Sequence, residues 1–174
     1  GFLAGRAEGT AGRAVTALMG GTRPGLVEVQ ALAAPSGYGT PQRVATGLDP
    51  KRLAVILAVL ERRAGASFAT RDVFVQVTAG VRLTEPGADL AVAAALLSSM
   101  HDRPPPANAI AIGELGLGRE QRPNGGVERR HSESARRGGG EAVGSARRTA
   151  TGWRRARRVL PPGGRCATGR PPGR

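Results

Sequence analysis

Two segments of the chain carry small or β-branched apolar residues at every second position, which is typical of half-buried strands. The first segment is residues 25–33 and the second is residues 72–81. The positions that share one face are Val27, Val29 and Ala31 in the first segment and Val73, Val75 and Val77 in the second. Both segments are therefore predicted strands, each with one face turned toward a core.

Two other segments have helical periodicity. Residues 47–65 contain a candidate N-cap at Asp49, a proline at the first helical position and Gly65 after the last turn. The apolar face of this helix is formed by Leu53, Ile56, Leu57 and Leu60. The segment from Pro86 to Met100 is apolar nearly all round, which predicts the most buried helix of the domain.

The remaining segments complete a mixed order of elements. Residues 101–108 are a predicted loop, 109–123 are two short strands or a hairpin, and 125–138 begin a third helix. An order that mixes strands and helices in this way indicates an α+β fold, in which a mixed, partly antiparallel sheet packs against helices.

The net charge of +13 is concentrated in the last quarter of the chain. Residues 1–127 have 13 basic and 10 acidic side chains, whereas residues 128–174 have 13 arginines and three glutamates. The segment 139–174 is mostly Gly, Arg, Pro, Ala, Ser and Thr, a composition that predicts a disordered tail. Such a tail could contact phosphates, be a solvated terminus, or result from GC-rich DNA read out of frame. We therefore expect a domain over 1–138 and a tail over 139–174.

Other features limit the class of protein. No apolar run reaches 18 residues and no basic-then-apolar leader opens the chain, so we expect a soluble, cytoplasmic protein that is not secreted. Cys166 is the only cysteine, which excludes an internal disulfide framework and a cysteine-based zinc cluster. The first residue is Gly, and we expect the chain to be a piece of a longer protein.

Candidate catalytic and ligand-binding motifs are sparse. A phosphate-binding Walker A loop needs Gly-x4-Gly-Lys-Ser/Thr, but the only lysine, Lys51, follows a proline. The glycines of "GELGLG" have the wrong spacing for a dinucleotide loop. His101 and His131 are too far apart in sequence for a metal motif and are predicted solvated histidines at helix ends. Glu85 and Asp89 could be paired carboxylates, but anionic residues in a first helical turn also suit the helix dipole, which is the favoured interpretation.

Three segments together resemble one family. They are residues 21–65 (including "GTPQRVATGLDPKRLAVILAVLERRAG"), 72–99 ("DVFVQVTAGVRLTEPGADLAVAAALLSS") and 113–123 ("GELGLGREQRP"). In this order and spacing they resemble the C-terminal domain of the RadA family (also called Sms), bacterial DNA repair proteins related to RecA. The resemblance runs from about Phe2 to about Gly138.

The resemblance implies the fold of the Lon protease proteolytic domain, which also occurs in a ribosomal small-subunit protein. In Lon proteases the matching corner reads Gly-Pro-Ser-Ala-Gly, and its serine works with a lysine. Here the two aligned positions are Gly87 and Glu128, so the resemblance implies a corner that has lost its reaction. After Gly138 the family's closing strand is expected to be absent or replaced, which would leave the fold incomplete at its C-terminal end.

The family resemblance also implies a function. It suggests a non-catalytic scaffold and DNA-contact domain of a DNA repair and recombination ATPase, binding single-stranded or branched DNA within a homo-oligomer, a hexamer in the family. The chain itself is expected to hold no cofactor, with ATP, Mg and Zn confined to a zinc finger and ATPase core outside it. The candidate DNA contacts are Arg43, Lys51, Arg52 and Arg82. The alternatives are a stand-alone basic nucleic-acid-binding module and a Lon-type serine protease.

Overall fold

The structure is a computed structural model that describes residues 10–20, 23–106, 109–117 and 142–144. The six strands are β1 (Arg13–Gly20), β2 (Arg23–Pro35), β3 (Arg43–Thr46), β4 (Arg71–Val77), β5 (Ile110–Ile112) and β6 (Ala142–Gly144). The two α-helices are α1 (Pro50–Val59) and α2 (Asp89–His101). Three short helical turns join them: η1 (Leu60–Ala64), η2 (Thr78–Gly80) and η3 (Pro86–Ala88).

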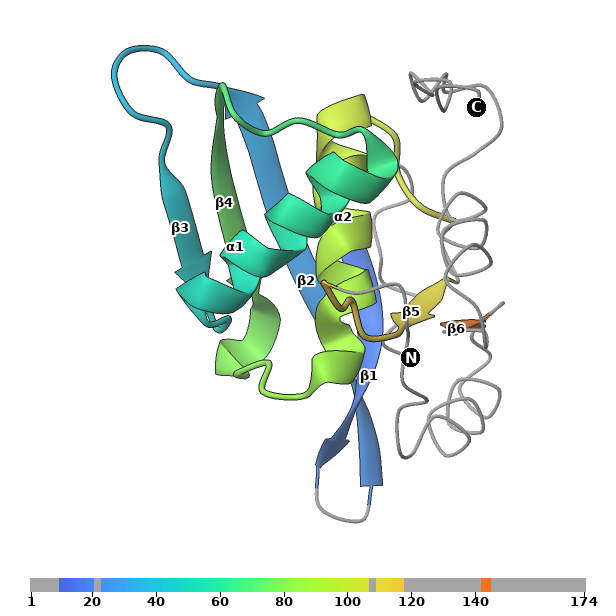
Figure 1. Cartoon of the computed structure of the whole chain (residues 1–174). Helices are drawn as coiled ribbons and strands as arrows, with labels where there is room; N and C mark the ends of the chain where they lie inside the picture. The colour runs from blue at the N-terminus through green and yellow to red at the C-terminus, as the bar shows by residue number, and fades with distance from the viewer. Residues whose placement is uncertain (1–9, 21–22, 107–108, 118–141, 145–174) are drawn as a thin grey trace.

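All six strands form one mixed sheet in the order β3-β4-β2-β1-β5-β6. Strand β2 pairs antiparallel with β1 and β4, while the β3–β4, β1–β5 and β5–β6 pairs are parallel. Both helices cover the same face of the sheet, with α2 crossing β1 and β2 (Figure 1). This arrangement confirms the predicted α+β class with a partly antiparallel sheet.

Both strands predicted from alternation are present. Val27 and Val29 of β2, and Val73, Val75 and Val77 of β4, are buried in the core beneath the helices. The second strand is shorter than predicted, because Ala79 and Gly80 both adopt positive φ (60° and 64°) in the turn η2 and so end the extended backbone.

Helix α1 follows its sequence signals closely. The Asp49 side chain accepts a hydrogen bond from the Lys51 backbone N–H (2.8 Å), as an N-cap does. The last turn, η1, widens into a π-helical turn and ends at Gly65, whose φ of 65° is left-handed. The four apolar residues that the periodicity placed on one face, Leu53, Ile56, Leu57 and Leu60, are all buried.

Helix α2 is the central element of the core, as its composition predicted. Every residue from Asp89 to Ser98 is buried. A second, smaller apolar cluster involves β1 and β5 and consists of Val15, Ala17, Ile110 and Ile112.

Three predictions for the C-terminal part have different outcomes. Residues 109–123 contain one described strand, β5, rather than a described hairpin, and 118–123 lie outside the described residues. The predicted third helix at 125–138 also lies outside them. The tail that was predicted to be disordered contributes β6, which pairs parallel with β5, because the outer edge of β5 offers backbone donors and acceptors to any extended segment.

Candidate functional site

The corner between residues 83 and 90 is the strand-to-helix turn that the resemblance to Lon proteases matches to their nucleophile corner. Leu83 forms a short parallel bridge to Leu48, the chain turns through η3, and α2 begins at Asp89. Gly87, the position aligned with the Lon serine, is buried, and its carbonyl oxygen accepts a hydrogen bond from the Gly113 N–H (2.8 Å). The carbonyl oxygen of Gly113 in turn accepts from the Leu90 N–H (3.0 Å). The segment after β5 therefore closes over the corner.

A partly buried ion pair holds this corner against α1. The Arg52 guanidinium binds both carboxylate oxygens of Asp89, with 2.8 Å between Arg52 Nε and Asp89 Oδ1. The Leu115 backbone completes the arrangement, because its N–H donates to Asp89 Oδ2 (3.0 Å) and its carbonyl accepts from Arg52 Nη2 (3.0 Å). One arginine thereby joins α1, α2 and the segment that follows β5. We call Arg52, Asp89 and Leu115 the corner clamp.

The corner clamp decides between the two interpretations of Asp89. Asp89 is only 3% exposed and both of its oxygens are engaged, so it is a structural carboxylate rather than an acid or base open to a substrate. Its partner is an arginine from another helix, a stronger interaction than the helix dipole alone. Glu85 immediately precedes η3 and is half-buried. Glu128, which aligns with the Lon lysine, lies outside the described residues.

Arg43 also has a structural role. Its guanidinium donates to the backbone carbonyls of Gln42 (3.0 Å), Phe68 (2.6 Å) and Arg71. These bonds tie the first residue of β3 to the turn that leads into β4. Arg43 and Arg52 are thus committed to holding the fold, which their sequence context did not indicate.

Lys51 and Arg82 are placed differently from the other two candidates. Both are exposed, and the Leu48–Leu83 bridge brings their two segments to the same end of the domain, where α1 begins. Within the part of the chain that the structure describes, neither side chain enters a hydrogen bond or an ion pair. Their cationic groups are therefore available to a phosphate.

The C-terminal end of α2 shows one departure from the predictions. His101 is half-buried rather than solvated, and its Nε2 is buried without a hydrogen-bond partner among the described residues. Burial lowers the pKa of His101, and the positive charges of Arg103 and Arg71 lower it further. The histidine is on the last turn of a helix that packs against the sheet, so a position at a helix end does not make it solvated. His131 lies outside the described residues.

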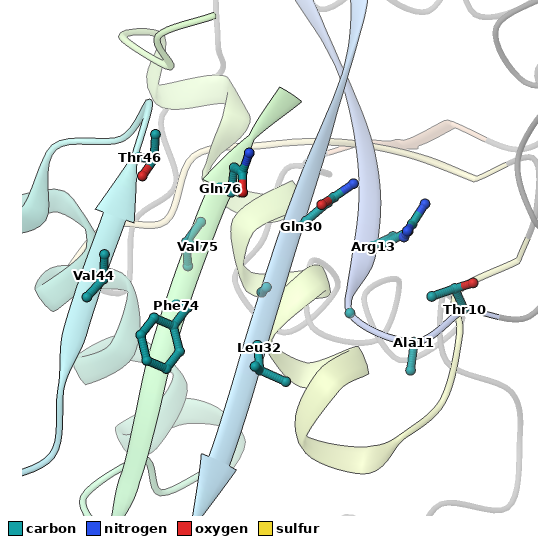
Figure 2. Close-up of a pocket in the computed structure, with 12 residues that line it drawn as sticks. Thr10, Ala11, Arg13, Gln30, Leu32, Val44, Thr46, Phe74, Val75 and Gln76 are labelled. Carbon is teal, nitrogen blue, oxygen red and sulfur yellow. The ribbon is translucent and has the colours of Figure 1, made fainter. Parts of the chain in front are cut away.

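The face of the sheet away from the helices carries a site that the sequence patterns did not identify. Leu32 on β2, Phe74 on β4 and Val44 on β3 are 55%, 36% and 45% exposed. They line a shallow hollow of about 380 Å³ together with Gln30 and other residues of β1–β4 (Figure 2). The available signal was an apolar residue on the polar side of each alternating segment, at positions 32 and 74.

Within the described ranges, no helix is long and apolar enough to cross a membrane. No group of three or more His, Cys, Asp or Glu side chains there could hold a metal ion. The expectation that cofactors bind outside this chain remains a prediction.

Fold and site together define an α+β domain whose strand-to-helix corner is held by a structural clamp. No protein-family model matches the chain. Three curated relatives, all named "DNA repair protein RadA", come from Bacillus subtilis (strain 168), Escherichia coli (strain K12) and Brucella abortus (strain 2308). The first two are 44% and 46% identical over 137 and 142 residues, or 79% and 82% of this chain. The third is 53% identical over 116 residues, or 67% of this chain.

These similarities establish the family. The chain belongs to the RadA family, as the three matching segments of its sequence suggested. It spans only 30%, 31% and 25% of the length of these three relatives.

Proposed function

We propose that this chain forms a non-catalytic scaffold and DNA-contact domain of a RadA-type DNA repair and recombination protein, with the fold of the Lon proteolytic domain. The observation that carries the proposal is the similarity to RadA over about four fifths of the chain. The corner supports a scaffold role, because Gly87 offers no nucleophile and both carboxylate oxygens of Asp89 are bound within the corner clamp. The corner therefore lacks the serine that a Ser/Lys dyad needs as its nucleophile.

The DNA contact is proposed at the end of the domain where α1 begins. Lys51 and Arg82 are exposed there on segments joined by the Leu48–Leu83 bridge. Each cation would bind a backbone phosphate without reading a base, so binding is expected to be independent of sequence and to weaken with salt. Arg43 and Arg52 are weaker candidates for DNA contact, since both guanidinium groups already bind the fold.

The test compares two double variants that remove the same charge. Lys51→Gln with Arg82→Gln removes the proposed contacts, and Arg62→Gln with Arg63→Gln removes two exposed arginines at the opposite end of α1. Binding of a fluorescent single strand is followed by anisotropy across a salt series. Loss of two phosphate contacts should make the slope of log K against log salt less negative by about 1.4. It should also weaken binding at least fivefold. The control pair should change affinity less than twofold. Equal effects from the two pairs would contradict the proposed contact.

The rival function is a basic nucleic-acid-binding module that depends on the tail. Nine arginines follow Gly138, and all of them lie beyond Ser145. A chain that ends at Ser145 keeps β6 and loses these nine charges. Weak, salt-sensitive DNA binding by the shortened chain supports the domain contact, whereas complete loss of binding supports the tail.

A further inference from the structure

The face of the sheet away from the helices is covered in one half and open in the other. Strand alternation puts Val15 of β1 on the same face as Arg13, and the register pairs Val15 with Ile110 of β5. Val15 and Ile110 are both buried. On the same face, Leu32 of β2 and Phe74 of β4 lie opposite each other, are exposed and line the hollow shown in Figure 2. We call Leu32 and Phe74 the apolar strip.

The described chain enters the domain at the rim of this hollow. Thr10 lines the hollow, and nine residues precede it in the sequence. Phe2 and Leu3 are the large apolar residues of that segment. Its charged side chains, Arg6 and Glu8, cancel each other. An apolar pair on a segment with no net side-chain charge is thus connected directly to the edge of an exposed apolar surface.

We propose that Phe2 and Leu3 pack on the apolar strip. Eight residues separate Phe2 from Thr10, and an extended connection of that length spans up to about 26 Å. Only β2 lies between β1 and β4, so the strip is at most about 10 Å from β1. The segment therefore reaches the strip without being fully extended. Because the segment is attached at the rim, its effective concentration at the strip is high and a small contact area is sufficient.

The C-terminal tail fits the strip less well. Its large apolar residues begin at Trp153, nine residues after β6, and β6 is four strand spacings from β4, about 19 Å. Closing this longer connection costs more entropy. Four of the five residues that follow Trp153 are arginines, and none of the described residues that line the hollow is acidic. Connection length and charge therefore both favour residues 1–9 as the occupant.

The contact would orient the domain within a longer protein. The resemblance is to the C-terminal domain of the family, and this chain spans about 30% of its relatives. The rest of such a protein would precede residue 1, and the docked segment would fix the side of the sheet from which it joins the domain. The inference does not depend on the proposed DNA contact, because neither Lys51 nor Arg82 lines the hollow.

Thiol labelling of the full chain tests whether the segment covers the strip. Gln76→Cys places a thiol beside Phe74, at an exposed position that lines the hollow. Cys166→Ser removes the natural thiol, so one site reports. Phe2→Ser with Leu3→Ser should raise the labelling rate at least threefold, because the segment would then leave the strip. Circular dichroism checks that each variant keeps the same fold.

Two matched pairs of serine substitutions are the controls. Arg6→Ser with Glu8→Ser changes the same segment but keeps its apolar pair, and Trp153→Ser with Leu160→Ser removes apolar residues of the tail. Each control pair should change the labelling rate less than twofold. An unchanged rate without the apolar pair of residues 1–9, or a larger increase in the tail variant, would overturn the proposal.

Disulfide crosslinking tests the proximity directly. Ala4→Cys and Gln76→Cys are combined with Cys166→Ser, which leaves the apolar pair and the apolar strip intact. Oxidation of the dilute protein should form an intramolecular disulfide, detected by mass as the loss of two hydrogens. Adding Phe2→Ser and Leu3→Ser should slow its formation at least fivefold, whereas the polar control pair should not.

Two outcomes of the crosslinking would overturn the proposal. Equal rates in all three proteins would show that the tether alone brings the thiols together. A disulfide between two chains, formed in place of the intramolecular one, would show that a second copy occupies the strip.

Discussion

Replacing Arg52 by methionine tests the corner clamp directly. The change keeps the aliphatic stem but removes the guanidinium that binds Asp89 and the Leu115 carbonyl. The Asp89 side chain, 4% exposed, would then be left as a buried carboxylate with the Leu115 N–H as its described donor. Removing one partner of a buried ion pair costs about 3–5 kcal/mol. The Arg52 side chain is 31% exposed, so solvent screens part of the interaction. We therefore expect Arg52→Met to lower the free energy of unfolding by about 3 kcal/mol.

The matching change at the other residue should cost less. Asp89→Asn keeps the shape and one acceptor, and the orphaned guanidinium of Arg52 can reach water, so about 1–2 kcal/mol is expected. With both substitutions the buried charge is gone, and the double variant should lose about 2 kcal/mol rather than the sum of about 4–5. The clamp thus predicts a coupling of about 2–3 kcal/mol between the two residues.

Urea unfolding followed by circular dichroism at 222 nm measures these free energies. Intrinsic fluorescence is a poor probe, since Tyr38 is fully exposed in the folded chain and Trp153 lies outside the described residues. Val44→Thr, at an exposed position of β3, provides the baseline for a neutral surface change. An Arg52→Met cost below about 1 kcal/mol, or strictly additive single effects, would refute the reasoning.

Two further predictions concern a glycine and a histidine. Gly47 and Gly39 have nearly equal positive φ (79° and 82°), but a Cβ on Gly47 would lie 2.6 Å from a backbone oxygen while one on Gly39 meets open space. Gly47→Ala should therefore cost at least about 1 kcal/mol more than Gly39→Ala in urea unfolding, and equal costs would show that the turn relaxes freely. His101 has a folded pKa below 6.5, so the unfolded chain takes up its proton first and stability should fall as pH drops from 6.5 toward the folded pKa. Melting temperatures of the wild type and His101→Gln between pH 7.5 and 5 check this, and parallel curves would contradict it.

The local elements could be predicted because their signals are local. Asp49 caps a helix through a backbone N–H two residues away, and Gly65 ends the same helix through its own left-handed backbone. The alternation around Val75 and the apolar run of α2 predict which side chains are buried, regardless of the elements that they pack against. The helix ends and the buried faces could therefore be predicted correctly from the sequence alone.

The pairing of distant side chains was decided by the tertiary structure. Arg52 and Asp89 are 37 residues apart, and nothing in either neighbourhood marks one as the partner of the other. An arginine that binds DNA and one that binds a buried carboxylate look alike in a sequence, because the difference depends on which segments cross. The same holds for His101, which is half-buried because α2 packs on the sheet, and for β6, which pairs with an edge that only the strand order creates.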